Sequence, residues 1–421
     1  MPEPLNADVV IVGAGMVGVT LAAGLAPSGA NIVILEQREG SISDYPALVA
    51  EQQQQGFDPR VSALTCASQQ ILTAVGAWDF IQSARISPYT AMDVWDGEGT
   101  GHIHFSANEL HEPVLGHIVE NRVTLSGLYQ AIEQWENITV MTGVSLSDLS
   151  SVERGRRRVM LDDGREINAE LVVAADGALS KTRQMAGIPM WEWDYGHHAI
   201  VTTVKTELDH QSTAWQRFTE DGPLAFLPLP KTEEGSYCSI VWSTSPSHAK
   251  TLMGLNEEDF CQALECAFER RLGRILSVDN RAVFPLRQRH AKHYIQAGFA
   301  AIGDAAHTIH PLAGQGVNLG LMDAAQLVDA LLAGKKRGES FGSDRVLKRF
   351  QRERQSDNLQ MSATMEAFKR LFDDPNPVSR LVRNMGMNLL DKLPPVKNHI
   401  VLSAMGLSGR LPELAKRPIR E

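Results

Sequence analysis

Three glycines near the start of the chain have the spacing of a turn that binds a dinucleotide. Gly13, Gly15 and Gly18 form the pattern GxGxxG directly after an apolar run. Glycine allows a tight turn and a close approach of the backbone to a pyrophosphate, and the N-terminus of the following helix offers free N–H groups. Glu36 ends the next apolar run, where a carboxylate can accept hydrogen bonds from ribose hydroxyls. We expect the dinucleotide to contact Gly13, Ala14, Gly15, Gly18, Glu36, Gln37 and Arg38.

Two later segments decide which dinucleotide this is. Segment 174–183 (AADGALSKTR) and segment 303–318 (GDAAHTIHPLAGQGVN) each follow an apolar run. Asp304 can hold ribityl hydroxyls close to the pyrophosphate. The loop 314–318 opens a helix, and its N–H groups would face the pyrimidine edge of an isoalloxazine, where negative charge develops on reduction. Together the two segments favour FAD over NAD.

The glycine turns need strands that end side by side. The apolar runs 8–13, 32–36, 171–175 and 299–302 predict buried strands, and the first two with the helix between them form a βαβ unit. The polar stretch 41–58, which contains four consecutive glutamines, predicts a loop. A helix is predicted from Gly316 to about Ala333.

The middle of the chain has a different pattern. Segments 198–206, 224–229 and 237–244 are strand-like and are separated by Pro, Gly and Glu turns, which predicts an antiparallel sheet. The region 257–272 predicts an amphipathic helix, and the C-terminal part predicts helices with a break at Pro394 and Pro395.

The predicted fold class is therefore α/β: a Rossmann-like FAD-binding domain, an inserted substrate domain with an antiparallel sheet, and C-terminal helices. The FAD-binding domain is expected to be discontinuous, and its predicted segments are 1–80, 110–185 and 285–340. The substrate domain is expected to comprise 81–109 and 186–284, and the helical region 341–421.

Composition argues against several classes of protein. Of 421 residues, 43% are hydrophobic and 21% are charged, as in an ordinary globular protein. The four cysteines form no CxxC pair and no His, Cys and Asp residues have metal-ligand spacing, so neither a disulfide scaffold nor a metal site is expected. A net charge of -10 argues against nucleic acid as a partner. With no signal peptide and no run of ~18 apolar residues, a cytoplasmic protein is expected.

The three glycine-containing segments resemble those of the FAD-dependent aromatic hydroxylases of the p-hydroxybenzoate hydroxylase type. Further segments, at 92–96, 115–121, 194–199, 225–229 and 239–243, are similar to the ubiquinone-biosynthesis hydroxylases of proteobacteria. The resemblance covers residues 8–411 and is closest to the hydroxylases that act at ring position 5 of a 2-polyprenylphenol. It implies an FAD-dependent monooxygenase that inserts one atom of O₂ into the ring of a polyprenylated phenol through a flavin C4a-hydroperoxide.

The resemblance also implies roles for individual residues. Asp304 would hold the region between the ribityl chain and the pyrophosphate, and Arg60 and Arg122 would lie near the flavin or its phosphates. Both arginines have a plainer interpretation, as the partner of a local carboxylate or as a surface charge. Asp176 and Arg183 are interpreted as partly structural links from a strand end to the cofactor loop. The other implied cofactor contacts are Gly303, Pro311, Gly314, Gln315, Gly316, Val317 and Asn318.

No acid–base residue is identified by these patterns. The weak catalytic candidates are Arg60, His307, His310 and Pro311. The two histidines are interpreted first as hydrogen-bonded loop residues. An apolar wall above the flavin could be formed by Phe226, Trp242 and Phe284, although ordinary core packing is the favoured interpretation for each of them.

Partners follow from the same reasoning. Because no second GxGxxG opens another βαβ unit, electrons would come from transiently bound NAD(P)H or from a separate electron-donor protein. We expect a homo-oligomer. Three alternatives stay open: a sister hydroxylase acting at another ring position, an FAD-dependent reductase of isoprenoid lipids, and a flavin-bearing assembly subunit.

The end of the chain is basic, whereas the whole chain is acidic. From Gly342 onward there are 15 Lys and Arg against 9 Asp and Glu, in a region rich in Leu and Met. This region, with Leu389, Leu390, Leu393 and Met405, is a candidate surface for a membrane or for other ubiquinone-biosynthesis proteins. A solvated helical face is the plainer interpretation.

Overall fold

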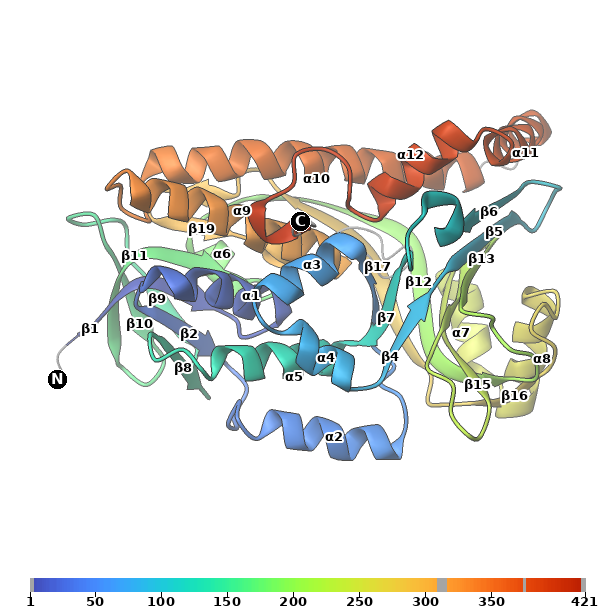
Figure 1. Ribbon diagram of the computed structural model, residues 1–421, viewed down its shortest axis with the longest axis horizontal. Coiled ribbons are helices and arrows are strands. Elements are labelled where there is room, and N and C mark those ends of the chain that lie inside the picture. Colours follow the sequence, from blue (N-terminus) through green and yellow to red (C-terminus); the bar gives the residue numbers. More distant parts are fainter. Residues whose placement is uncertain (1–3, 309–315, 374–375, 418–421) are drawn as a thin grey trace.

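The computed structural model describes residues 4–308, 316–373 and 376–417. Its core consists of two large sheets that lie at opposite ends of the molecule, with the long helix α10 (Asp344–Asp373) running along one side (Figure 1). The predicted α/β fold class, with an FAD-binding part, a second sheet and C-terminal helices, is confirmed.

An eight-stranded sheet carries the N-terminal βαβ unit. Its strand order is β18-β19-β11-β1-β2-β8, with β10 and β9 added on β11. The strands pair in parallel from β19 to β8, so their carboxyl ends meet at one edge. The bounds are β1 Leu5–Val12, β2 Ile32–Glu36, β8 Ile138–Thr142, β9 Leu146–Leu149, β10 Arg157–Leu161, β11 Glu166–Ala174, β18 Ile295–Gln296 and β19 Phe299–Ala301. The four strands predicted for this sheet are thereby confirmed.

Apolar helices cover the sheet. Helix α1 (Met16–Leu25) links β1 to β2 and packs against α9 (Gly316–Lys336) and α5 (Asn121–Ile132). Among the described residues, α9 is the one helix whose length and mean hydropathy (1.2 over 18 residues) would allow it to cross a membrane. However, 61% of that stretch is buried inside the protein, as expected for a core helix.

The predicted loop at 41–58 is wrong. Residues Tyr45–Gln55 form helix α2, with Pro46 in its first turn. Proline suits a helix start, and the alanine, glutamate and glutamines that follow are good helix formers. The apolar period that usually reveals a helix is missing because Val49 is its single buried residue.

A nine-stranded sheet forms the other end of the molecule. Its order is β20-β17-β12-β15-β14-β13-β5-β6, with β16 paired to β12. The pairs are antiparallel except for β13 with β5, which are parallel. The bounds are β5 Ala91–Asp96, β6 His102–Ser106, β12 Met190–Thr206, β13 Thr213–Thr219, β14 Gly222–Pro228, β15 Ser236–Thr244, β16 Ile275–Val278, β17 Ala282–Ala291 and β20 His307–Thr308. The three predicted strand segments lie in β12, β14 and β15.

Helices α7 (Pro246–Gly254) and α8 (Glu257–Ala267) cover one face of this sheet. Helix α8 ends five residues before the predicted end at Leu272, because Glu269 and Arg270 adopt left-handed backbone angles. Phe226 stacks on Phe268 in this core, and Trp242 packs against Phe260. These two aromatic side chains therefore form ordinary core, which confirms the favoured interpretation for them, and they do not belong to an apolar wall above the flavin.

A small third sheet lies between the two large ones. Strand β7 (Gly116–Glu120) pairs with β3 (Val61–Thr65) and β4 (Ile86–Tyr89), and helices α3 (Cys66–Ala74) and α4 (Trp78–Ser83) follow β3. Beyond α10, the chain forms α11 (Pro377–Asp391) and α12 (Pro394–Ala404). The predicted helix break at Pro394 is confirmed.

Two buried histidines predict an acid-sensitive fold. Burial lowers the pKa of His117 and of His290 to about 4, well below the value of ~6.5 expected for an unfolded chain. The folded state thus favours the neutral ring, and the stabilisation is complete above pH ~6.5 and declines as the pH falls toward 4. When the pH is lowered from 7 to 5, the free energy of unfolding should therefore fall by about 2 kcal/mol for each of these histidines.

Urea unfolding at both pH values measures this loss. In His117→Phe, whose ring keeps an edge contact with Trp78, we expect the loss to shrink by about 2 kcal/mol. The exposed His293→Asn is the control and should behave as wild type. An equal pH dependence in His117→Phe and wild type would contradict the assignment.

Candidate functional site

The three segments singled out in the sequence meet at the carboxyl edge of the eight-stranded sheet. Backbone hydrogen bonds join them: Gly13 N–H donates to Leu35 O at 2.8 Å, and Ala175 N–H donates to Val12 O at 2.8 Å. Ile302 N–H donates to Ala174 O at 3.0 Å, which places Gly303 beside the same edge. Ligands of open α/β sheets bind at this edge.

Glycines are required where the segments touch. A Cβ on Gly18 would lie 2.1 Å from Gly13 O, and one on Gly13 would lie 2.5 Å from Ala175 O. On the other side of α1, a Cβ on Gly320 would lie 2.6 Å from the side chain of Val17, which also contacts Gly303. These glycines therefore hold the first turn, the strand end after β11 and the start of α9 in direct contact.

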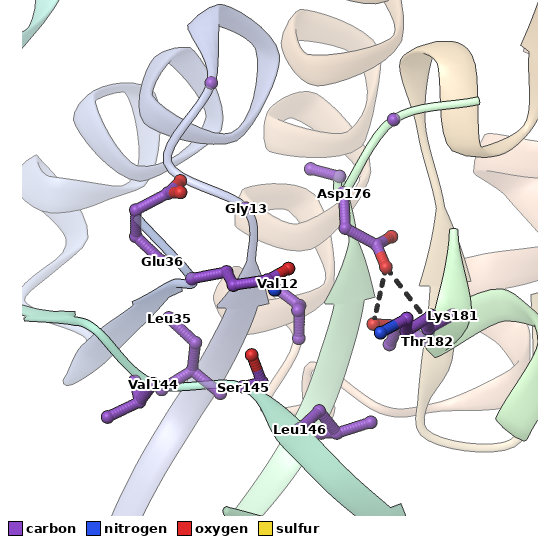
Figure 2. Close-up of a pocket in the computed structure, with 14 residues that line it drawn as sticks. Val12, Gly13, Leu35, Glu36, Val144, Ser145, Leu146, Asp176, Lys181 and Thr182 are labelled. Atoms are coloured by element: carbon purple, nitrogen blue, oxygen red, sulfur yellow. Dashed lines mark hydrogen bonds between the residues drawn. The ribbon is translucent and has the colours of Figure 1, made fainter. Parts of the chain in front are cut away.

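Gly15 is different, because no described residue crowds it. A Cβ there would lie more than 4 Å from every atom of residues 4–308, 316–373 and 376–417, and its φ of −74° is open to any residue. It lines a pocket of about 330 Å³, together with Glu36, Gln37 and Asp176 (Figure 2). A glycine that the fold does not need, facing a pocket, indicates that a ligand approaches the backbone here.

Glu36 and Asp176 flank this pocket at the ends of β2 and β11, the two strands on either side of β1 (Figure 2). The Glu36 carboxylate accepts the N–H of Ala14 and the N–H of Arg38, both at 2.9 Å, which fixes its direction. Oδ2 of Asp176 accepts from Thr182 N–H at 3.1 Å and from its hydroxyl at 2.9 Å. Oδ1 of Asp176 is buried and has no hydrogen-bond partner among the described residues, so an acceptor is left for a ligand. These features fit the adenosine and pyrophosphate part of a dinucleotide.

The comparison with protein families decides the identity of this site. A family model described as an FAD binding domain matches residues 6–363. The chain belongs to this family. The predicted cofactor, FAD, is thereby confirmed, and so is the class of FAD-dependent monooxygenase.

Relatives of known name narrow the family to the ubiquinone-biosynthesis hydroxylases. The 3-demethoxyubiquinol 3-hydroxylase of Escherichia coli is 40% identical over 401 residues, which is 95% of this chain and 98% of the relative. The ubiquinone biosynthesis monooxygenase COQ6 of Xenopus tropicalis is 34% identical and covers 95% and 94% of the two chains. The ubiquinone hydroxylase UbiL of Rhodospirillum rubrum is 34% identical and covers 97% and 91%.

A solved structure shares the fold. The p-nitrophenol 4-monooxygenase PnpA of Pseudomonas putida matches with a TM-score of 0.76 and 20% sequence identity, over 96% of this chain and 99% of that chain. The arrangement of an FAD-binding sheet and a second large sheet is thus common to flavin monooxygenases of different sequence.

The two arginines implied by the resemblance have different surroundings. Arg122 donates to the buried Glu120 at 2.6 Å and to Gly56 O at 2.8 Å, and Arg85 donates to the other oxygen of Glu120. Arg122 is therefore held by the protein and does not line the Glu36 pocket. Arg60 is exposed, and its guanidinium lies 5.7 Å from the Phe284 ring on β17, between the two large sheets.

The segment after β19 combines an exposed acid with a buried network. Asp304 is exposed in the short helix η3 (Gly303–Ala305). His307 is buried, with Nε2 2.5 Å from Oδ2 of Asp323 on α9, and the same oxygen accepts Gly303 N–H at 3.0 Å. Oδ1 of Asp323 accepts from Nε of Arg354 at 2.7 Å. The candidate His307 thus lies in the interior, as a structural partner of Asp323.

Burial alone would raise the pKa of Asp323, but His307 and Arg354 outweigh it and hold the pKa well below its ordinary value. The carboxylate is therefore charged, and it joins the Gly303 turn to α9 and α10. Nothing in the sequence pointed to this pairing, because Asp323 and Arg354 occur in ordinary helical stretches.

The start of α9 is fixed by Asn318. Its amide donates to Ala63 O at 2.8 Å, and its oxygen accepts from Thr65 N–H at 3.1 Å and from the Ser68 hydroxyl at 2.7 Å. The side chain is thus fully used in holding α9 to β3 and α3. The predicted residues His310, Pro311, Gly314 and Gln315 lie outside the described residues.

Other residues near the site carried no recognisable signal. The Tyr129 hydroxyl on α5 donates to Ala14 O at 2.9 Å, and burial raises its pKa to about 12. Arg183 is buried and donates to Ala305 O at 3.0 Å, which ties helix α6 (Lys181–Met185) to η3. This contact agrees with the interpretation of Arg183 as a partly structural link between a strand end and the cofactor loop. Lys181, Thr182 and Ser145 line the pocket.

Glu36→Gln tests the acidic side of the pocket. The amide presents one acceptor where the carboxylate presents two, so the Ala14 and Arg38 N–H groups and the ribose can no longer all be satisfied. We expect the Kd for FAD to rise about 10- to 100-fold, measured by quenching of flavin fluorescence. The exposed neighbour Glu39→Gln should bind FAD as wild type. Equal FAD affinity in both variants would show that Glu36 does not contact the cofactor.

Proposed function

We propose that the protein hydroxylates the ring of a polyprenylated phenol in ubiquinone biosynthesis, at ring position 5. The observation that carries this proposal is the convergence of the FAD-binding segments in a chain that aligns almost from end to end with ubiquinone hydroxylases. One oxygen atom of O₂ enters the ring and the other leaves as water. The two electrons come from NAD(P)H or from a reductase.

When bound, FAD supplies the activation of O₂, and the protein positions the reactants. The glycine turn would hold the pyrophosphate, Glu36 the ribose, and Asp304 the ribityl region. The backbone at the start of α9 would receive the pyrimidine edge of the ring system. Because β20 follows η3 and pairs with β17, the second sheet is held directly beside the Asp304 segment, where it can exclude water from the reaction.

The substrate would approach along β17. Of the three aromatic residues proposed as an apolar wall, Phe284 is exposed, whereas Phe226 and Trp242 are buried. The Arg60 guanidinium above Phe284 offers a positive charge beside an aromatic face, which suits an electron-rich phenol ring. We place the ring of the substrate between these two side chains and the flavin.

A second candidate is hydroxylation at another ring position. It is favoured by the relative with 40% identity, whose name assigns it to 3-demethoxyubiquinol. A lipid profile of a strain that lacks the gene separates the two. Accumulation of a 2-polyprenylphenol, or of a product that lacks the oxygen at position 5, supports the first proposal. Accumulation of a demethoxyubiquinol-type intermediate supports the second.

Incorporation of ¹⁸O tests the chemistry itself. The FAD-loaded protein is supplied with a reductant, ¹⁸O₂ and the accumulated lipid, and the product is analysed by mass spectrometry. One ¹⁸O atom per ring is expected. Oxidation or reduction of the lipid without ¹⁸O would replace the hydroxylase proposal by the reductase alternative. Restoration of quinone synthesis by a variant that cannot bind FAD would instead indicate an assembly role.

A further inference from the structure

The outward faces of helices α11 and α12 are apolar. On α11, Leu381, Val382, Met385 and Leu389 are 60%, 59%, 64% and 59% exposed. The exposed row continues beyond the helix break with Leu393, Val396 and Ile400. Their spacing of three to four residues puts them along one face of each helix. We call these seven residues the apolar face.

The polar side chains of the same helices point the other way, into the protein. Arg383 is buried and pairs with the buried Asp96 at 2.7 Å, and Asn384 accepts from Gly101 N–H. Asn388 and Asp391 accept the N–H groups of His102 and His104, each at 3.1 Å. Lys397 is buried and pairs with Glu109 at 2.8 Å. The usual amphipathic arrangement is thus inverted, with polar contacts inside and apolar side chains outside.

Charge around the apolar face has one sign. Between residues 376 and 411 the sequence contains five Lys and Arg and a single acid, Asp391, although the whole chain has a net charge of -10. That acid is turned inward, to His104 and Lys397. Lys392 and His399 are exposed beside the apolar residues. Of the five basic residues, Arg383 and Lys397 are buried in ion pairs and Arg410 pairs with Glu353, so the exposed cation beside the apolar face is Lys392. The face therefore combines apolar side chains with a positive charge at its edge, and it complements an anionic, apolar surface.

Helices α11 and α12 are too short to cross a bilayer. Because each has one exposed apolar face, they can lie flat on its surface. Helix α11 has 15 residues and α12 has 11, or about 22 and 16 Å, against a hydrocarbon core of ~30 Å. They lie at the end of the molecule beside β5 and β6 (Figure 1). A second copy of the chain is a poorer occupant, because a two-fold interface would bring the positive charge of Lys392 from both copies to one contact.

We propose that the apolar face of α11 and α12 docks the protein on the surface of a bilayer that contains anionic lipid. The seven side chains would enter the boundary between headgroups and acyl chains, with Lys392 and His399 at the level of the phosphates. The inference rests on the two helices alone and holds for any ring position or substrate. Of the residues expected at such a surface, Leu389 and Leu393 are exposed, whereas Leu390 is half-buried and Met405 is buried in the core.

Co-sedimentation of the full FAD-loaded chain with vesicles tests the proposal. The test variant is the triple substitution Leu381→Ser, Met385→Ser and Leu389→Ser. The control is Leu48→Ser, Leu208→Ser and Leu276→Ser, three leucines that are 46–52% exposed elsewhere on the protein. With vesicles of phosphatidylglycerol and phosphatidylcholine, we expect the partition coefficient to fall at least about 30-fold in the test variant and to stay within about twofold in the control.

Two further measurements keep folding, lipid binding and chemistry apart. FAD content shows whether the test variant is folded, and hydroxylation of a detergent-solubilised, short-tailed phenol should be equal in both variants. Lys392→Glu should weaken binding to phosphatidylglycerol vesicles about tenfold and leave binding to pure phosphatidylcholine unchanged. Absence of wild-type binding, or equal binding by the test variant and the control, would overturn the proposal. So would loss of self-association in the test variant, measured by sedimentation velocity without lipid, if vesicle binding is unchanged.

Discussion

Asp323→Asn is expected to lower the free energy of unfolding by about 3–5 kcal/mol, although it changes a single oxygen into an amide. The carboxylate is fully buried and sits between His307 and Arg354. Its replacement leaves the guanidinium of Arg354, 4% exposed, without its buried charged partner, so that the exposed Asp357 alone remains beside it. The amide nitrogen must also face a hydrogen-bond donor, His307, Gly303 or Arg354. Breaking one side of a buried ion pair is among the most costly single substitutions.

Urea unfolding in excess FAD measures the effect. The control is Asp344→Asn on α10, whose exposed carboxylate pairs with Lys348 at 2.7 Å. Such surface pairs contribute about 0.5 kcal/mol or less. Similar losses in the two variants would show that the Asp323 network is dispensable. Because Asp323 also accepts Gly303 N–H, we expect a lower FAD content in the surviving folded fraction.

Gly15→Val is expected to abolish FAD binding while leaving the chain folded. In the part of the chain that the structure describes, no atom lies within 4 Å of the added Cβ, and the backbone angle at Gly15 suits valine. It would, however, occupy the space into which the pyrophosphate must come. Since about 3 kcal/mol of lost binding already corresponds to more than a hundredfold in Kd, we expect no flavin to be retained on purification and at least a hundredfold loss of hydroxylation.

Gly18→Ala is the matched comparison on the same turn. Its Cβ would lie 2.1 Å from Gly13 O, so the backbone itself must move and the variant should fail to fold. Circular dichroism and flavin absorbance separate the two outcomes: Gly15→Val folded without flavin, Gly18→Ala not folded. A Gly15→Val protein that retains FAD would show that the pocket is not where the pyrophosphate binds.

Local patterns predicted the cofactor side of the fold well. Strands β1, β2, β11 and β19 each contain a continuous apolar run, as is typical of buried parallel strands, and the glycine-containing segments follow β1, β11 and β19. The family match and the relatives confirm FAD and a ubiquinone-pathway hydroxylase. The contacts proposed for single residues stay predictions; among them, Glu36 and Gly15 line the pocket, whereas Arg122 is bound to Glu120.

What was missed depends on contacts between distant parts of the chain. Asp323 and Arg354 belong to different helices, and neither has a motif that announces a buried pair. Phe226 and Trp242 are buried, as the favoured interpretation had it, but the sequence could not single out the exposed Phe284, because a strand's alternation does not say which face is covered by helices. Helix α2 lacks an apolar stripe because one residue of it is buried. Helix α11 does have an apolar stripe, but this stripe faces outward, and the composition of the segment could not show its direction.

The pairing of β17 with β20 has a mechanical consequence. Arg289 and His290 on β17 pair with Thr308 and His307, immediately after the Asp304 segment. The ten-residue strand β17 also pairs with β12 in the second sheet. Because η3 follows β19 of the eight-stranded sheet and leads directly into β20 of the nine-stranded sheet, one short chain segment joins the two sheets at the Asp304 turn. A hinge motion between the sheets would have to bend this segment, so we expect a large substrate to enter between side chains and loops at the rim.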